Sequence, residues 1–99
     1  MNDADLIHKA LANPFRRNVL AWLKTPNEAF TAKHIDFRYG VPLNAIHARS
    51  GLSQSTVSAH VAMLVDAGLL VSTRVSQWIF LSRNEEVISD FARQLTLHL

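Results

Sequence analysis

Apolar residues recur along the first quarter of the chain at the spacing of helix turns. This periodicity predicts helices over residues 3–12 and from Pro14 to Lys24. The first apolar stripe consists of Leu6, Ile7, Ala10 and Leu11, and the second of Phe15, Val19, Trp22 and Leu23. Asn13 before Pro14 is typical of a helix start, because Asn caps free amides and Pro fits the first helical position. We expect Thr25–Asn27 to end the second helix.

Residues 28–42 follow no clean period. The segment contains Phe30, Ile35, Phe37 and Tyr39, and Gly40 and Pro42 lie near its end. We expect an irregular or partly helical connector that its aromatic residues hold in place.

Two further helices, over residues 43–50 and 53–67, are predicted on either side of Gly51. The second has an inward stripe made of Val57, Val61, Leu64 and Val65. Gly68 then favours a left-handed helix stop. Two helices joined by so tight a turn are typical of DNA-binding helix-turn-helix units.

A hairpin and a last helix are predicted to complete the chain. The β-rich runs 70–75 and 77–81 flank Ser76, although this turn lacks the usual glycine. Trp78 and Phe80 alternate on one strand face and are expected in the core. Asn84 is expected to cap a final helix with the stripe Ile88, Phe91 and Leu95. The order predicts a mainly α, winged helix-turn-helix fold, with about five helices and a two-stranded β-hairpin wing.

Composition narrows the possible classes of protein. Ninety-nine residues fit one domain, and 48% hydrophobic against 18% charged residues suggests an apolar oligomer interface. The absence of cysteine excludes disulfides and thiolate metal sites. No apolar run has the roughly 20 residues of a membrane span, and residues 1–5 lack a signal-peptide pattern, so we expect a cytoplasmic protein. A net charge of +2 is compatible with DNA binding without requiring it.

Two motifs resemble those of the ArsR-type winged-helix repressors. Residues 10–20, Ala-Leu-Ala-Asn-Pro-Phe-Arg-Arg-Asn-Val-Leu, are similar to that family's Leu-x-Asp-Pro-x-Arg-x-x-Ile-Leu opening of the second helix. Residues 52–61, followed by Leu64 and residues 67–70, are similar to its recognition-helix signature. The resemblance covers most of the chain, because the wing and final helix follow in the family's order.

The resemblance implies a homodimer that binds a pseudo-palindromic operator and represses transcription until an effector loosens it. Family members generally dimerise through their first and last helices. The residues that would form this interface here are Leu6, Ile7, Ala10, Leu11, Ile88, Phe91 and Leu95.

The chain departs from the family's metal sensors in two places. Alignment on Gly51 puts Pro42 and Asn44 where these sensors often carry a Cys-x-Cys pair. The connector over residues 28–42 is also longer than usual. We therefore expect no metal site of that kind and no cofactor.

Small polar residues open the predicted recognition helix. Gln54 can offer a bidentate amide to adenine, whereas Ser55, Thr56 and Ser58 can bond base edges or phosphates. His60, further along, can donate to a phosphate. Alternatively, the hydroxyl side chains only cap the helix, and Ser53 is expected to do so.

Basic and amide side chains elsewhere are candidate DNA contacts. Arg74 and Gln77 flank the predicted wing tip and can reach a minor groove or a phosphate, unless the hairpin is simply exposed. Arg16, Arg17 and Arg49 either contact phosphates or are solvated charges.

Other functions receive less support from the sequence. A small organic effector can bind at Trp22, Phe30, Phe37 or Tyr39, although such residues are more often core. His34 and Asp36, and separately Asp90 and His98, are too few and too scattered to predict a metal site. No motif of a hydrolase, phosphate-binding loop or zinc protease is present, so we expect no enzyme. The alternative function is a winged-helix protein–protein interaction module.

Overall fold

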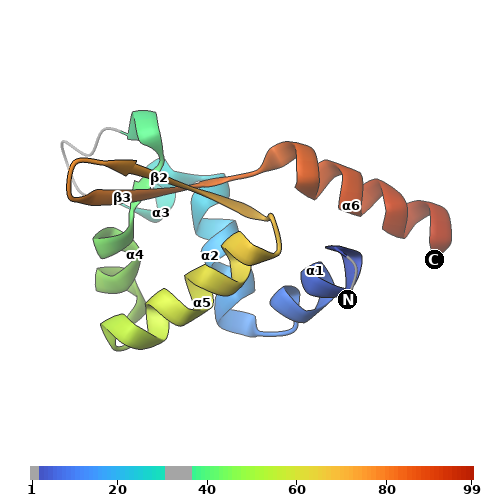
Figure 1. Cartoon of the computed structure of the whole chain (residues 1–99), viewed down its shortest axis with the longest axis horizontal. Coiled ribbons are helices and arrows are strands. Elements are labelled where there is room, and N and C mark those ends of the chain that lie inside the picture. Colours follow the sequence, from blue (N-terminus) through green and yellow to red (C-terminus); the bar gives the residue numbers. More distant parts are fainter. Residues whose placement is uncertain (1–2, 31–36) are drawn as a thin grey trace.

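The computed structural model describes residues 3–30 and 37–99, which form a mainly helical winged helix-turn-helix fold (Figure 1). This confirms the predicted fold class. The helices are α1 (Asp3–Leu11), α2 (Pro14–Lys24), α3 (Pro26–Ala29), α4 (Leu43–Ser50), α5 (Gln54–Asp66) and α6 (Glu85–His98), with a 3-10 turn η1 (Phe37–Tyr39). The strands are β1 (Val41–Pro42), β2 (Leu70–Val75) and β3 (Trp78–Arg83).

The sheet has three antiparallel strands in the order β1-β3-β2. The hairpin register runs from Leu70 opposite Arg83 to Val75 opposite Trp78, whereas Val41 of β1 lies opposite Leu81. The prediction of a two-stranded wing was therefore incomplete. The hairpin itself is confirmed, but β3 begins one residue later than expected and extends two residues further, to Arg83.

Part of the segment predicted as an irregular connector is ordered. The second helix ends at Lys24, as expected, but Pro26 then begins the short α3, and Val41 is buried in β1. Gly40 makes this strand possible: its φ is 108°, and a Cβ there would lie 2.4 Å from the carbonyl oxygen of Leu81. His34, Ile35 and Asp36 lie outside the described residues.

The turn between α4 and α5 forms as the sequence predicts. Gly51 has the left-handed conformation, with φ 70°. Ser53 caps α5, because its hydroxyl accepts a hydrogen bond from the amide of Thr56 at 3.2 Å. Gly68, with φ 81°, follows the C-terminus of α5.

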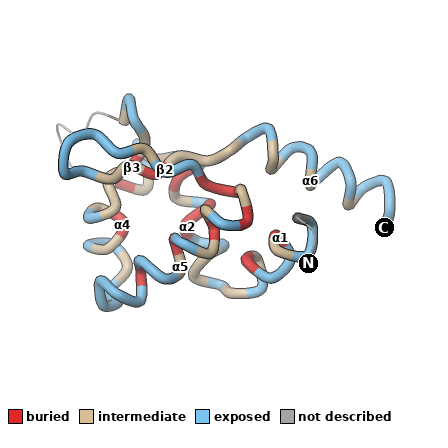
Figure 2. The backbone as a smooth tube through the Cα atoms, in the orientation of Figure 1, coloured by how far each residue is buried: buried red, intermediate tan, exposed pale blue. Residues whose placement is uncertain are grey.

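The core lies between α2, α4, α5 and the sheet, as the buried segments in Figure 2 show. Its fully buried large side chains include Ile46, Leu64, Leu69 and Leu81. Trp78 is 47% exposed, so its predicted place in the core was wrong, whereas Phe80 is half-buried. No residue of α6 is buried, and this helix extends away from the core past α1.

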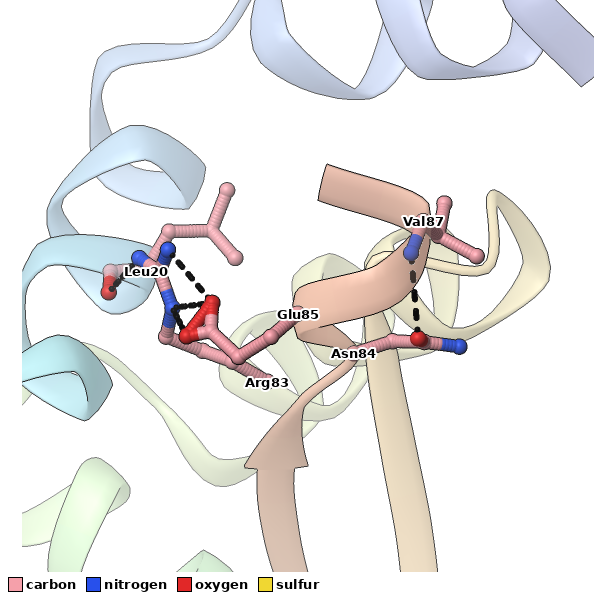
Figure 3. A network of polar contacts seen from close by, with 5 residues as sticks. All are labelled: Leu20, Arg83, Asn84, Glu85 and Val87. Carbon is pink, nitrogen blue, oxygen red and sulfur yellow. Dashed lines mark hydrogen bonds and ion pairs between the residues drawn. The ribbon is translucent and has the colours of Figure 1, made fainter. Parts of the chain in front are cut away.

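A polar network fixes the start of α6 (Figure 3). Asn84 caps the helix, as predicted, by accepting from the amide of Val87 at 3.2 Å. Arg83 pairs with the carboxylate of Glu85 at 2.9 Å and donates to the carbonyl of Leu20 at 3.0 Å. The strand β3 and the origin of α6 are thereby tied to α2.

Candidate nucleic-acid interface

The N-terminal half of α5 presents a polar face to solvent. Gln54, Ser55, Thr56 and Ser58 are all exposed, whereas Val57, Val61 and Leu64 are buried on the opposite face. The face is free to meet another molecule without disturbing the core.

Capping occupies some of these hydroxyl groups. The hydroxyl groups of Ser53 and Thr56 lie 2.7 Å apart, and that of Ser55 lies 3.3 Å from Ser53. In the part of the chain that the structure describes, Gln54 and Ser58 make no hydrogen bond through their side chains. These two keep their full hydrogen-bonding capacity for a partner.

The wing lies beside the start of α5. Ser76 has a φ of 56°, which allows the two-residue turn to close without glycine. Gln77 at this turn lines one groove together with Gln54 and Ser58, so the structure brings these predicted residues together. Arg74 is exposed, and its Nε lies 3.4 Å from the carbonyl oxygen of Ser76.

The same groove contains three residues that the sequence did not predict as DNA contacts. Asn44 and His47, three positions apart on α4, line it together with the exposed Trp78. The i, i+3 spacing of the two α4 residues was the available sequence signal. For Trp78 the sequence signal was misleading, because its alternation with Phe80 along the strand predicted a buried side chain, whereas Trp78 is exposed.

His60 is turned toward α2. Its ring packs against Phe15 with centroids 5.1 Å apart, and its Nδ1 lies 3.0 Å from Nη1 of Arg16. Burial, and secondly the charge of Arg16, lower the pKa of His60, which favours the neutral imidazole. The structure thus favours a packing role for His60 over the predicted phosphate contact.

Arg49 is also held by its own chain. Its guanidinium lies 4.7 Å from the ring centroid of Trp22 and donates to the carbonyl of Ala29. This geometry favours a structural cation–π contact over the predicted contact with a DNA phosphate.

The two arginines at the start of α2 donate hydrogen bonds to the C-terminal end of α1. Arg16 donates through Nε to the carbonyl of Ala10 at 2.7 Å, and Arg17 donates to that of Leu11 at 2.6 Å. Both satisfy carbonyl groups that have no partner within α1. They are not merely solvated charges.

The predicted dimer residues divide into two groups. Ile7 and Ala10 are already buried within the single chain, at 5% and 0% exposure, so they have little surface left for a partner. In contrast, Leu6, Leu11, Ile88, Phe91 and Leu95 are only half-buried. An open groove of about 710 Å³ runs between α1 and α6, with Phe91 and Leu95 in its lining.

The aromatic residues proposed for an organic effector pack on one another instead. Trp22 contacts Phe30 edge to face, with centroids 6.2 Å apart, and Phe30 contacts Phe37 at 6.5 Å. Tyr39 contacts Phe80 at 5.6 Å. These contacts favour the alternative that these aromatic residues are packed parts of the fold. Within residues 3–30 and 37–99, His, Asp and Glu side chains form no group able to hold a metal ion.

Charge is distributed unevenly along the molecule. Between Phe37 and Arg83 the only carboxylate is Asp66, whereas the segment contains Arg38, Arg49, Arg74 and Arg83. The first half of α6 carries Glu85, Glu86 and Asp90, of which Glu85 pairs with Arg83 and Asp90 with Arg93. Acidic side chains are thus absent from the N-terminal half of α5 and from the wing.

Two helices joined by a tight turn, a polar second helix and an adjacent wing define a winged helix-turn-helix DNA-binding regulator. The sequence profile of the IclR helix-turn-helix domain matches residues 19–74. The chain is also 34% identical over 88 residues to the "Uncharacterized HTH-type transcriptional regulator YbzH" of Bacillus subtilis (strain 168), a match covering 87% of this chain and 88% of that protein. The chain belongs to the helix-turn-helix transcriptional regulators, with a helix-turn-helix domain of the IclR type, and is not an enzyme.

Solved structures share the fold. HlyU from Vibrio cholerae N16961 is 25% identical, with a TM-score of 0.64 over 97% of this chain and 91% of that one. The crystal structure of an ArsR family transcriptional regulator gives a TM-score of 0.68 at 20% identity, over 96% and 89% of the two chains. In the described ranges, none of the helices has the length and apolar character needed to cross a membrane.

Proposed function

We propose that this regulator is a homodimeric repressor that binds a pseudo-palindromic operator. The observation that carries the proposal is the exposed polar face at the start of α5, with Gln54 and Ser58 unpaired beside the wing. Small polar side chains allow a helix to approach base edges closely in the major groove. Arg74 and Gln77 would extend the contact from the wing.

The dimer is supported by the groove between α1 and α6. Phe91 and Leu95 face it, and α6 has no buried residue in the single chain. A second copy placed on this groove would cover apolar surface that water otherwise contacts. The chain would then act as one winged-helix domain over residues 1–99, with Leu6, Leu11 and Ile88 at the margins of the interface. Two recognition helices about 34 Å apart would meet successive major grooves.

We also propose membership of the ArsR type in particular, which the two sequence motifs and the shared fold support.

A thiophilic metal is an unsuitable effector because the chain has no cysteine. A small organic effector would instead bind in the α1–α6 groove, whose volume of about 710 Å³ suits such molecules. An effector bound in this groove would change the arrangement of the two copies in the dimer. As a regulator of transcription, the protein would act in the cytoplasm.

The test is a fluorescence-anisotropy titration with labelled DNA from the gene's own upstream region, against scrambled DNA, at two salt concentrations. We expect a preference of about 10³ or more for the native sequence. Gln54→Ala combined with Ser55→Ala should abolish this preference, whereas Ser89→Ala on exposed α6 should preserve it. Equal affinity for both DNAs, unchanged by the double substitution, would overturn sequence-specific repression.

The titration also tests the alternative of a protein–protein interaction module. A docking surface usually carries large aromatic or aliphatic side chains, which the start of α5 lacks. Absence of DNA binding at either salt concentration, together with a partner complex that survives high salt, would favour the alternative.

A further inference from the structure

The groove beside the recognition helix has walls from three elements. The α4 wall contributes Asn44 and His47, α5 contributes Gln54 and Ser58, and the wing contributes Gln77 and Trp78. Its volume of about 250 Å³ is below the usual range of small-molecule pockets. The groove is open to solvent and can therefore hold only a small group or a short piece of a longer chain.

The chemistry of the walls suits an anion attached to an apolar group. All six polar or aromatic residues offer a hydrogen-bond donor, whether an amide, a hydroxyl, an imidazole or the indole N–H. No carboxylate lines the groove in the described part of the chain. Leu43, Val57 and Ile79 supply apolar surface between these donors. A phosphodiester provides acceptor oxygens, and its deoxyribose provides the matching apolar face.

Trp78 is the exceptional residue in this groove. Tryptophan is enriched at interfaces because its large apolar ring also carries an N–H donor, and this one is 47% exposed within the groove lining. The neighbouring Phe80, two positions along β3, is half-buried and packs on Tyr39. Within the described residues, Trp78 has no such aromatic partner.

We propose that this groove binds the sugar–phosphate backbone of one DNA strand, with Trp78 packed against a deoxyribose. The proposal rests on the proposed DNA-binding function and extends it to Asn44, His47 and Trp78. DNA is the occupant we infer because the groove adjoins the exposed face of α5 and lacks acidic groups. Since backbone contacts carry no sequence information directly, the groove would position the protein on the duplex.

The first experiment uses the fluorescence of Trp78. The chain has two tryptophans, and Trp22 lies apart from the groove, beneath Arg49 in the aromatic cluster. In a Trp22→Phe variant, acrylamide should quench Trp78 at least about twofold less efficiently once DNA saturates the protein. The wild type compared with Trp78→Phe gives the same signal by difference, should Trp22→Phe fold poorly.

The second experiment separates positioning from sequence reading. Trp78→Ala should weaken binding about tenfold to the native and the scrambled DNA alike, leaving their ratio unchanged. Val71→Ala is the matched control, because Val71 is 43% exposed on β2 and does not line the groove. It should leave both affinities unchanged.

The outcomes distinguish failure of the backbone site from failure of the proposed DNA-binding function. DNA binding by anisotropy with unaltered quenching of Trp78 would overturn the backbone site alone. A Trp78→Ala variant that loses affinity only for the native sequence would also overturn it, because the residue would then read bases. Absence of DNA binding by the wild type would overturn the proposed function and this site with it.

Discussion

Nη1 of Arg16 lies 3.0 Å from Nδ1 of His60, joining the start of α2 to the middle of α5. Because a guanidinium only donates hydrogen bonds, the imidazole accepts here and carries its proton on Nε2. Arg16 also donates to the carbonyl of Ala10 at the end of α1. One side chain thus connects the recognition helix to a helix of the proposed dimer interface.

The first prediction concerns pH. Burial and the neighbouring Arg16 lower the pKa of His60 below its ordinary value of 6.5. Below about pH 6.5 the unfolded chain binds a proton at this residue that the folded chain does not, so stability falls as the pH drops toward the lower, folded-state pKa. Urea unfolding between about pH 7.5 and 5.5 should show a smaller loss for His60→Asn than for the wild type. Ser89→Ala, at an exposed position that does not titrate, is the control and should retain the wild-type dependence.

Arg49 and Arg74 should differ in what they contribute. Arg49→Ala removes the cation–π contact with Trp22 and should cost about 1 kcal/mol of stability while leaving the salt dependence of DNA binding unchanged. Arg74→Ala at the wing should lower the slope of log K against log salt by about one. Thermal unfolding and salt titrations measure the two effects. A reduced slope for Arg49→Ala would instead support its predicted phosphate contact.

Gly40→Ala should disrupt the third strand. The new Cβ would lie 2.4 Å from the backbone of Leu81, and the φ of 108° is unfavourable for any side chain. We expect a loss of at least about 2 kcal/mol in the free energy of unfolding. Gly51→Ala is the control: it has a φ of 70° but nothing within 4 Å of the added atom, so it should cost only about 1 kcal/mol. Equal losses would show that the close approach to β3 is unimportant.

Ser76→Gly should stabilise the wing. Ser76 has a φ of 56°, a conformation that glycine adopts without steric cost. We expect a gain of about 0.5 kcal/mol, after allowing for the greater freedom of glycine in the unfolded chain. Ser72→Gly within β2 should instead lose about 1 kcal/mol. Denaturant unfolding of both variants checks the prediction, and a loss at Ser76 would contradict it.

Phe91→Asp should separate the proposed dimer. The charge would enter the α1–α6 groove, where burial against a second copy is costly. Analytical ultracentrifugation should show monomers for this variant. Leu97→Asp, on the same helix but 64% exposed and outside the groove lining, should remain a dimer. A dimeric Phe91→Asp protein would place the interface elsewhere.

Local signals made most of the fold predictable. Asn13 and Asn84 cap α2 and α6 as expected, and Gly51 and Ser53 mark the turn before α5. These signals act within a few residues, so they can be recognised without knowledge of the tertiary structure. The two-residue strand β1 has no such signal, because neither period 2 nor period 3.6 can be detected over so short a length. Its formation depends on β3, about forty residues away in the chain.

The candidate site was predicted less completely for a similar reason. Periodicity correctly placed Gln54 and Ser58 on the polar face of α5, but it does not specify which neighbour a long side chain will reach. Arg49 lies over Trp22 and His60 lies against Phe15 only because α2 packs beside α4 and α5. Likewise, Trp78 is exposed because it is the first residue of β3, next to the turn of the wing. Tertiary packing decided these positions.

The separation of charge has a consequence for how the molecule approaches DNA. Its extents are 42 × 24 × 24 Å, with the wing and α4 toward one end of the long axis and α6 toward the other (Figure 1). A net charge of +2 gives only weak attraction. Glu85 and Asp90 of α6 are paired with Arg83 and Arg93, so the acid-poor wing end, more than α6, makes each chain an electric dipole. In the field of a duplex this dipole experiences a torque before contact. Encounters would therefore begin with the recognition helix already turned toward the DNA.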